Sequence, residues 1–248
     1  MIQLSSTQKK VFDIYRNEGH IKAWNYWKLM GNTYGIFLGE VPSNHFINGK
    51  SLANHVGLTK GVLCNNNVAW LKFLLDGNII YVAKKPLMHS VSWDDINECG
   101  AVFENEGTNI DIDSNTYDIT LLRGLNKNYN LSGKFYGFDM DCTHTSEWNR
   151  LMYPIHSGMH TDNDNPSNPS VLYAQWATYS DSDLGVQYTS DSETANWVQE
   201  TQHTNDTKRF YRGNVGVTYV SSLTSTIAYS GIGWRPALRL KFDSLIIY

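Results

Sequence analysis

The chain has 248 residues, a formal net charge of −4 and a hydrophobic content of 41%. This length suits one large domain or two modest ones, and the apolar content is enough to bury a sizeable core. The small charge gives no electrostatic footprint for nucleic acid, and the aromatic content of 13% argues against disorder. We therefore expect a folded protein that does not bind nucleic acid.

Charged residues account for only 18% of the chain, and Asn, Ser, Thr, Gly and Tyr take their place. This balance is typical of β-rich, loop-rich binding scaffolds. The cysteines at positions 64, 99 and 142 lie far apart without metal-ligand spacing, so we expect reduced thiols, synthesis in a cytosol and no metal or cofactor. Residues 1–20 are too polar for a signal peptide, and the apolar runs are too short for membrane insertion.

The first part of the chain predicts two helices and a hairpin. An amphipathic helix is expected at 5–18, and a short helix at 51–56 lies between two glycines. The apolar runs 68–75 and 79–83 are rich in β-forming residues and enclose Asp76-Gly77-Asn78. Because Asp-Gly between such runs is the strongest short hairpin signal, we predict two antiparallel strands here.

A capped helix and a second hairpin follow. Ser92 is expected to begin a helix that Gly100 ends, and Asp95 stands three residues after the cap, as in a capping box. A new strand is expected to begin with residues 101–103. Alternating residues at 109–122 turn back at 113–115, which predicts the second hairpin.

The segment 146–156 predicts a short helix around which the rest of the chain is organised. Ser146 caps it, and Pro154 ends its regular turns. One face carries the large apolar side chains of Trp148, Leu151, Met152 and Ile155. A helix this short is unstable alone, so we expect other elements to clamp it. The expected clamp consists of Trp176, Trp197, Trp234 and the turn Tyr211-Arg212-Gly213.

The last third of the chain alternates short apolar runs with polar loops. Residues 158–170 are rich in Asp, Asn, Ser and Pro, which predicts an exposed loop. The last strong strand is predicted at 233–242. One of its faces carries Trp234, Leu238, Leu240 and Phe242, and Pro236 indicates a sheet edge or a strand start.

Two sets of residues resemble a known group when they are taken together. The first set comprises Trp70-Leu71-Lys72-Phe73, Asp76-Gly77, the run 81–86 and Ser92-Trp93-Asp94. The second comprises the run 146–151, Gln175-Trp176, Trp197, Arg212-Gly213 and the run 233–238. In combination they resemble a group of tailed-bacteriophage virion structural proteins over about residues 60–242.

The second set is also similar to the C-type-lectin-like fold of the formylglycine-generating-enzyme type. In that fold a Glu-Trp on a helix, an Arg-Gly turn and a terminal Gly-aromatic-Arg strand form the core. The matching positions are Glu147-Trp148, Arg212-Gly213 and Gly233-Trp234-Arg235. The resemblance implies an α+β, β-rich scaffold with short helices that displays variable loops, and it makes these positions core residues. A buried Arg235 also needs a partner, which we expect to be Glu147 or a set of carbonyl groups.

The sequence departs from that enzyme type in its cysteines. Those enzymes need a reactive cysteine pair late in the chain, whereas the last cysteine here is Cys142. We therefore expect neither oxidase nor sulfatase-modifying chemistry, and because no catalytic motif is recognisable elsewhere we expect no enzymatic activity. Asp181 and Asp183 could act as the paired acids of a glycosidase, but two carboxylates this close in a loop favour the capping of turns.

The resemblance implies a tail- or fibre-associated virion protein that attaches to a host-surface glycan. Residues 1–105 are expected to form a docking region, and 106–248 a C-type-lectin-like region that displays loops, although the two can form one continuous domain. The binding loops are expected at 157–170, 187–207 and 221–231. The residues predicted to bind the glycan are Tyr188 and Trp197, by stacking, and Asn163, Asp164 and Asn165, by hydrogen bonds.

A second interpretation is purely architectural. The N-terminal helix and the aromatic segment 24–37 would then join virion proteins, in capsid decoration or tail joining, without receptor binding. Both interpretations expect other virion proteins as partners, a homo-oligomer on the particle and assembly in the host cytoplasm.

Overall fold

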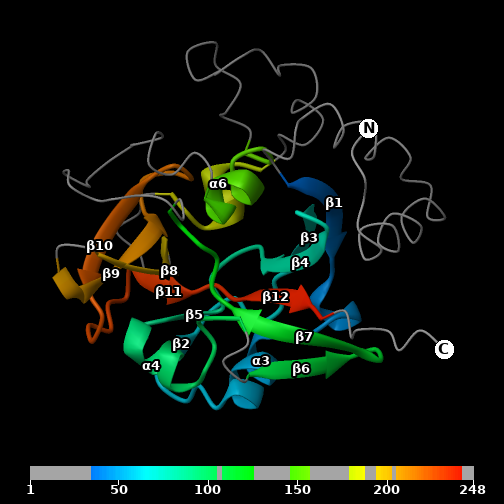
Figure 1. Ribbon diagram of the computed structural model, residues 1–248, viewed down its shortest axis with the longest axis horizontal. Coiled ribbons are helices and arrows are strands. Elements are labelled where there is room, and N and C mark those ends of the chain that lie inside the picture. Colours follow the sequence, from blue (N-terminus) through cyan, green and yellow to red (C-terminus); the bar gives the residue numbers. More distant parts are fainter. Residues whose placement is uncertain are drawn as a thin grey trace, which may run out of the picture.

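The computed structural model describes residues 35–104, 108–125, 146–156, 179–187, 194–202 and 205–241. The described chain is β-rich, with two six-stranded sheets and a few short helices (Figure 1). The predicted helix at 5–18 lies outside the described residues. Among the described helices, none has the length and apolar character needed to cross a membrane.

The first sheet is antiparallel throughout, in the order β1-β3-β4-β12-β7-β6. Its strands are β1 (Ile36–Val41), β3 (Trp70–Leu75), β4 (Asn78–Ala83), β12 (Ala237–Leu240), β7 (Asn115–Thr120) and β6 (Asn109–Ile112). The central pairing of β4 with β12 joins strands that are more than 150 residues apart in the chain. Neither end of the chain could therefore complete this sheet alone.

The second sheet has the order β10-β9-β8-β11-β5-β2, and only its β8–β11 pair is parallel. Its strands are β10 (Val220–Thr224), β9 (Asn205–Gly213), β8 (Ala195–Gln202), β11 (Ile232–Trp234), β5 (Met88–His89) and β2 (Val62–Leu63). Like the first sheet, it combines strands from both sides of residue 105. The regions 1–105 and 106–248 therefore share both sheets.

Both predicted hairpins are confirmed, with tighter turns than expected. Leu75 pairs with Asn78, so the turn holds only Asp76 and Gly77, at φ values of 50° and 83°. Two consecutive positive φ values are typical of the type I′ turn, whose twist matches that of the flanking strands. The second hairpin has the same form, since the turn between Ile112 and Asn115 also holds two residues with positive φ.

The helices are η1 (Ser43–His45), α3 (Gly49–Val56), α4 (Trp93–Glu98), α6 (Glu147–Met152) and α8 (Asp181–Leu184). The capping box of α4 is confirmed, because the Ser92 and Asp95 side chains each accept the other residue's backbone N–H. Helix α3 begins before the predicted residue 51, since Asn48 Oδ1 accepts the Ser51 N–H at 2.9 Å and thereby caps it.

Two strand predictions are wrong. The segment 101–103 forms no strand; it is a buried bend whose Val102 carbonyl accepts the Leu121 N–H at 3.0 Å. The predicted strand 233–242 is divided between the two sheets, with Arg235 and Pro236 between β11 and β12. Pro236 does precede a strand start, but β12 lies at the centre of its sheet between β4 and β7, not at an edge.

Both sheets contribute side chains to each of two hydrophobic cores. The alternation of side chains along β8 sends Trp197 into one core and Val198 into the other. The first core also holds α3 and α4. The second core contains the apolar side chains of α6, and Figure 1 shows that this helix lies between strands β3–β4 and strands β8–β10.

Candidate functional site

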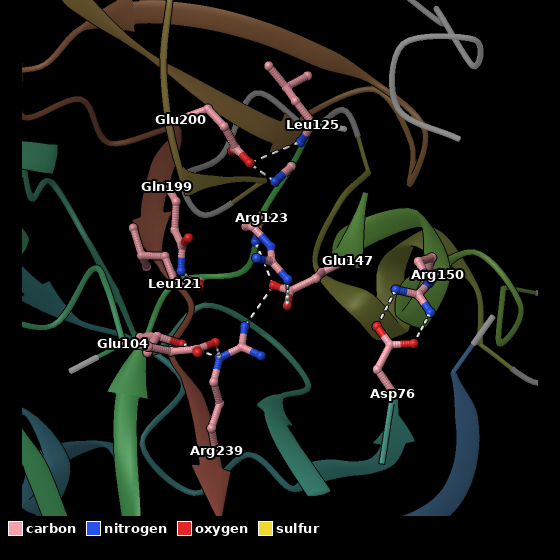
Figure 2. Close-up of polar contacts among 12 residues, drawn as sticks. Asp76, Glu104, Leu121, Arg123, Leu125, Glu147, Arg150, Gln199, Glu200 and Arg239 are labelled. Atoms are coloured by element: carbon pink, nitrogen blue, oxygen red, sulfur yellow. Dashed lines mark hydrogen bonds and ion pairs between the residues drawn. The ribbon is translucent and has the colours of Figure 1, made fainter. Parts of the chain in front are cut away.

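Helix α6 is fixed at both of its polar ends. Ser146 Oγ accepts the Asn149 N–H at 3.1 Å and caps the helix, as predicted. At the other end, the Arg150 guanidinium donates to both carboxylate oxygens of Asp76, in the β3–β4 turn (Figure 2). The Arg150 carbonyl also accepts the Gly35 N–H at 2.8 Å. The helix is thus tied to β1 and to the first hairpin.

Two buried arginines pack against Trp148: Arg212, which belongs to the predicted clamp, and Arg235. The Arg212 and Arg235 guanidinium groups lie 5.8 and 5.4 Å from the centre of its indole ring. Such contacts attract a cation to the ring face. The indole N–H donates to the Val217 carbonyl at 2.7 Å. Trp197 and Trp234 belong to the other core, so the expected clamp is wrong in these two members, and Trp176 lies outside the described residues.

The arginines find amide and carbonyl oxygens rather than carboxylates. Arg235 donates to Asn196 Oδ1 at 2.9 Å and to the Leu184 carbonyl, which is the carbonyl-type partner expected from the sequence. Arg212 donates to the Gly124 carbonyl at 2.9 Å and to Asn149 Oδ1. Burial lowers the pKa of both guanidinium groups to about 9, so both remain largely protonated at neutral pH.

Glu147 forms ion pairs with two arginines other than Arg235, the partner expected from the sequence. Its carboxylate, only 3% exposed, accepts from Arg239 Nη2 at 2.7 Å and from Arg123 Nη2 at 2.8 Å (Figure 2). The backbone N–H of Arg123 adds a third hydrogen bond, at 2.9 Å. Burial by itself would raise the pKa of Glu147, but the two guanidinium groups together hold it below its usual range.

A second carboxyl group close to this network is shifted in the opposite direction. Glu200 of β8 accepts the backbone N–H groups of Gly124 at 2.9 Å and Leu125 at 3.3 Å (Figure 2). Burial raises its pKa to about 7, and the negative charge of Glu147 adds to the rise, although the amide donors oppose it. Glu200 therefore exchanges its proton near neutral pH.

Opposite pKa shifts in two carboxyl groups can mark an acid–base pair. Here all four carboxylate oxygens of Glu147 and Glu200 accept hydrogen bonds from protein groups. These groups belong to residues 123–125 and to Arg239. The geometry therefore favours fixing the segment that ends at Leu125 over handling a substrate.

The scaffold holds together the ends of three segments that lie outside the described residues. Close to the ends of segment 126–145, the backbone N–H of Trp148 donates a hydrogen bond to the Arg123 carbonyl at 2.9 Å. For 157–178, Tyr179 N–H donates to the Ile155 carbonyl at 3.0 Å, and His156 forms a parallel bridge with Tyr179. Near the ends of segment 188–193, the Val186 carbonyl accepts a hydrogen bond from the Gly216 N–H, and the Thr194 carbonyl accepts one from the Asn214 N–H. Each segment thus leaves and re-enters the scaffold at fixed points.

Asp181 connects two of these anchor points. Its Oδ1 lies 2.9 Å from His156 Nε2 and accepts the Val217 N–H at 3.1 Å. Asp183 instead accepts the Ser180 N–H at 2.9 Å and completes a capping box on α8. Both aspartates are therefore used within the scaffold: Asp183 caps a turn, as predicted, whereas Asp181 contacts His156 and Val217 instead.

The predicted ligand-binding residues meet different outcomes. Asn163, Asp164, Asn165 and Tyr188 lie outside the described residues. Trp197 is only 1% exposed, and its indole N–H donates to the Val91 carbonyl at 2.9 Å. The prediction that Trp197 stacks on a sugar is therefore wrong, because its ring is part of the first core. Within the described ranges, no group of three or more His, Cys, Asp or Glu residues is placed to hold a metal ion.

The sequence interpretation missed an exposed aromatic residue in the predicted binding loop 221–231. Tyr229, in the loop between β10 and β11, is 56% exposed. Loop 221–231 was expected to take part in binding, but a single tyrosine among polar residues carries no signal of its exposure. Comparisons with models of protein families, with curated proteins and with solved structures find no match to this chain.

Proposed function

We propose that this chain is a tail- or fibre-associated structural protein of a tailed-bacteriophage virion, which displays loops for adhesion to a host-surface glycan. The observation that carries the proposal is the anchoring of the long segments 126–145 and 157–178 beside α6. Their ends are held by backbone hydrogen bonds to a buried, ion-paired base. A rigid base that carries long polar segments is the usual architecture of a binding scaffold.

The meeting of the three motif elements supports a C-type-lectin-like C-terminal region. The Glu147-Trp148 helix, the Arg212-Gly213 turn and the Gly233-Trp234-Arg235 strand are far apart in the sequence. In the structure both arginines lie against the Trp148 ring, and Asn196 bridges them by accepting from Arg235 Nε and donating to the Arg212 carbonyl. This mutual packing is what the resemblance implies for core positions.

The proposed receptor loop can be tested by alanine substitution. Replacing Asn163, Asp164 and Asn165 together should weaken attachment of the virion to its bacterial host, because these side chains would supply hydrogen bonds to sugar hydroxyls. A matched control removes two asparagines and one acid from the exposed surfaces of α3 and α4, namely Asn54, Asn97 and Glu98. Unchanged attachment of the 163–165 variant would remove this loop from the proposal.

Immunogold labelling tests the location on the particle. Antibody against the chain should label the tail tip or fibre end of intact purified particles in electron micrographs. Label over the head, or evenly along the tail, would favour the architectural function instead. Absence of the chain from the particle's proteins would overturn both virion functions.

One observation favours the architectural function as a second candidate. Strand β2 lies at the edge of the second sheet, and its Val62 and Leu63 are 50% and 37% exposed. An apolar edge strand offers backbone groups and side chains for pairing with another chain. If this function holds, Val62→Lys should reduce incorporation of the protein into particles, whereas the 163–165 variant should be incorporated and attach normally.

A further inference from the structure

One face of the first sheet is covered differently at its two ends. At the end that carries Trp70, this face belongs to the first core, and Phe46 stacks on Tyr81 with ring centres 4.4 Å apart. The opposite end lies beside the β3–β4 turn. There the same alternation of side chains presents Leu74 and Ile79, which pair directly across β3 and β4. These two side chains lie beyond the first core, in a separate apolar cluster.

This cluster has five members. Ile79 is its buried centre, and partly exposed side chains from β1, β3, β4 and β12 pack around it. They are Leu38, Leu74, Tyr81 and Leu240. Whereas each of the two cores combines side chains from both sheets, this cluster draws all of its members from the first sheet alone. We call it the outer cluster.

An apolar sheet face requires a second layer. Contact of apolar side chains with water is unfavourable, so a hydrophobic sheet face packs against another element in a stable domain. The four members of the outer cluster that surround Ile79 remain partly exposed among the described residues. A segment that completes their burial has to be apolar, and it has to lie within reach of these strands.

The segment 242–248, beyond the described residues, meets both requirements. Its sequence is Phe-Asp-Ser-Leu-Ile-Ile-Tyr, in which five of the seven side chains are apolar or aromatic. It begins two residues after Leu240, the member of the outer cluster that β12 contributes. Side chains two residues apart in an extended chain lie on the same side, so Phe242 would continue the row that Leu240 begins.

The strands on both sides of β12 end where this segment begins. In the registers of β12 with its two neighbours, residue 242 would stand opposite Gly77 in the β3–β4 turn, and residue 243 opposite Ser114 in the β6–β7 turn. A straight continuation of β12 would therefore leave the sheet and carry apolar side chains into water. A turn back onto the sheet instead buries them.

The segment is long enough to cross the outer cluster. Seven extended residues span about 23 Å, at about 3.3 Å per residue. In the order β1-β3-β4-β12, three strand spacings of about 4.8 Å separate β12 from β1, which makes about 14 Å. A segment that turns beside Leu240 can therefore pass over Ile79 and Leu74 and reach Leu38.

We propose that residues 242–248 turn back across the first sheet and dock on the outer cluster of their own chain. Asp243 and Ser244 are residue types that favour turns, and they precede the apolar run 245–248. The Lys72 ammonium, 5.6 Å from the Tyr81 ring centre, borders the cluster with a charge opposite to that of Asp243. Docking makes this face part of the folded interior, so it is not a surface for other virion proteins. Docking of this kind is independent of the proposed adhesion function.

A photoreactive amino acid tests the docking in the full chain. With a benzophenone side chain in place of that of Tyr248, near-ultraviolet light should join residue 248 to β1, β3 or β4, as identified by mass spectrometry of the cross-linked peptides. A mixture of isotope-labelled and unlabelled chains shows whether the joined peptides come from one molecule. The same side chain at Tyr229, which is 56% exposed beside the second sheet, serves as the control and should not reach these strands.

Urea unfolding measures what the docked segment contributes to stability. A chain that stops after Lys241 should have a midpoint lower by about 0.5 to 1 M urea, because several apolar side chains return to water. Leu74→Asn should lower the midpoint less in the shortened chain than in the full chain, since residues in contact are energetically coupled. Val62→Asn, on the exposed edge of the second sheet, should shift it equally in both lengths.

Each result separates docking from its alternatives. Cross-links from residue 248 to the first sheet of the same molecule, with a smaller Leu74→Asn effect after shortening, would support docking. Cross-links only between labelled and unlabelled chains would overturn it in favour of a cover that a second copy supplies. Cross-links confined to other strands, the absence of any cross-link, or equal Leu74→Asn effects in the two lengths would also overturn it.

Discussion

The carboxyl group of Glu200 should make the protein less stable as the pH rises from about 4.5 to about 7. In the unfolded chain this group loses its proton near its ordinary pKa of 4.5, whereas in the folded protein its pKa is about 7. Between these values the folded state holds a proton that the unfolded state has released. Raising the pH therefore favours unfolding.

The size of this effect follows from the pKa difference. The interval between 4.5 and about 7, at about 1.36 kcal/mol per pKa unit, corresponds to about 3 kcal/mol of unfolding free energy at pH 8. Glu147, Glu40 and Asp95 have pKa values shifted downward, so their stabilising contributions are present at higher pH and are lost as the pH falls. Comparison with a variant that lacks only the Glu200 titration isolates its effect.

Glu200→Gln is that variant. At pH 5 the protonated carboxyl and the amide are alike in shape and hydrogen bonding, so the two proteins should have nearly equal unfolding free energies. The glutamine does not titrate, so at pH 8 it escapes the loss of about 3 kcal/mol that the Glu200 titration causes in wild type. The variant should therefore be more stable than wild type by about 3 kcal/mol at pH 8.

Urea unfolding followed by tryptophan fluorescence at pH 5, 6, 7 and 8 measures the difference. The exposed Glu98, changed to Gln, serves as the control and should run parallel to wild type. A Glu200→Gln curve that also stays parallel to wild type, or one that falls below it at pH 8, would refute the proposed titration.

Substitutions at four further positions test the scaffold. Glu147→Gln should lower the unfolding free energy by about 3–5 kcal/mol because it leaves buried guanidinium groups without their anion, whereas Asp76→Asn, in a half-exposed pair, should cost less than about 1 kcal/mol. The Glu147 effect should shrink in acid, since the wild-type carboxylate is then protonated. Gly213→Ala, at a φ of 93° and with a Cβ placed 2.7 Å from the Thr194 carbonyl oxygen, should cost at least about 1 kcal/mol in the same urea assay. Ser92→Ala removes the cap of α4 and should lower the thermal midpoint by an amount equivalent to about 1 kcal/mol, while Ser92→Thr should largely retain it.

The local features of the fold could be predicted from the sequence because neighbouring residues decide them. Asp76-Gly77 adopts the two positive φ values of a type I′ turn, and Ser92 with Asp95 forms a capping box within a single helical turn. The local part of the candidate site could also be predicted, because the cap at Ser146 and the apolar face of its helix follow from residue type and spacing.

The partners within the site depended on the tertiary structure. Glu147 accepts hydrogen bonds from Arg123 and Arg239, which lie 24 and 92 residues away in the sequence. Arg235, the partner expected for Glu147, donates to Asn196 instead. Any of these charged residues could have formed another pair as far as the sequence shows. The order of strands in the two sheets selected the pairs, because it brings distant residues within hydrogen-bonding distance.

The packing of the two sheets also decided which aromatic side chains are exposed. The sequence by itself determined the turns, the helix caps and the β-rich character of the chain, since these depend on backbone preferences and on the period of apolar side chains. Only the tertiary structure could bury Trp197 between β9 and α4 and leave Tyr229 at the surface, because both are aromatic residues in short polar-flanked runs. Which of two such residues is available to a ligand depends on which face of which sheet is covered, and that is fixed by contacts far apart in the chain.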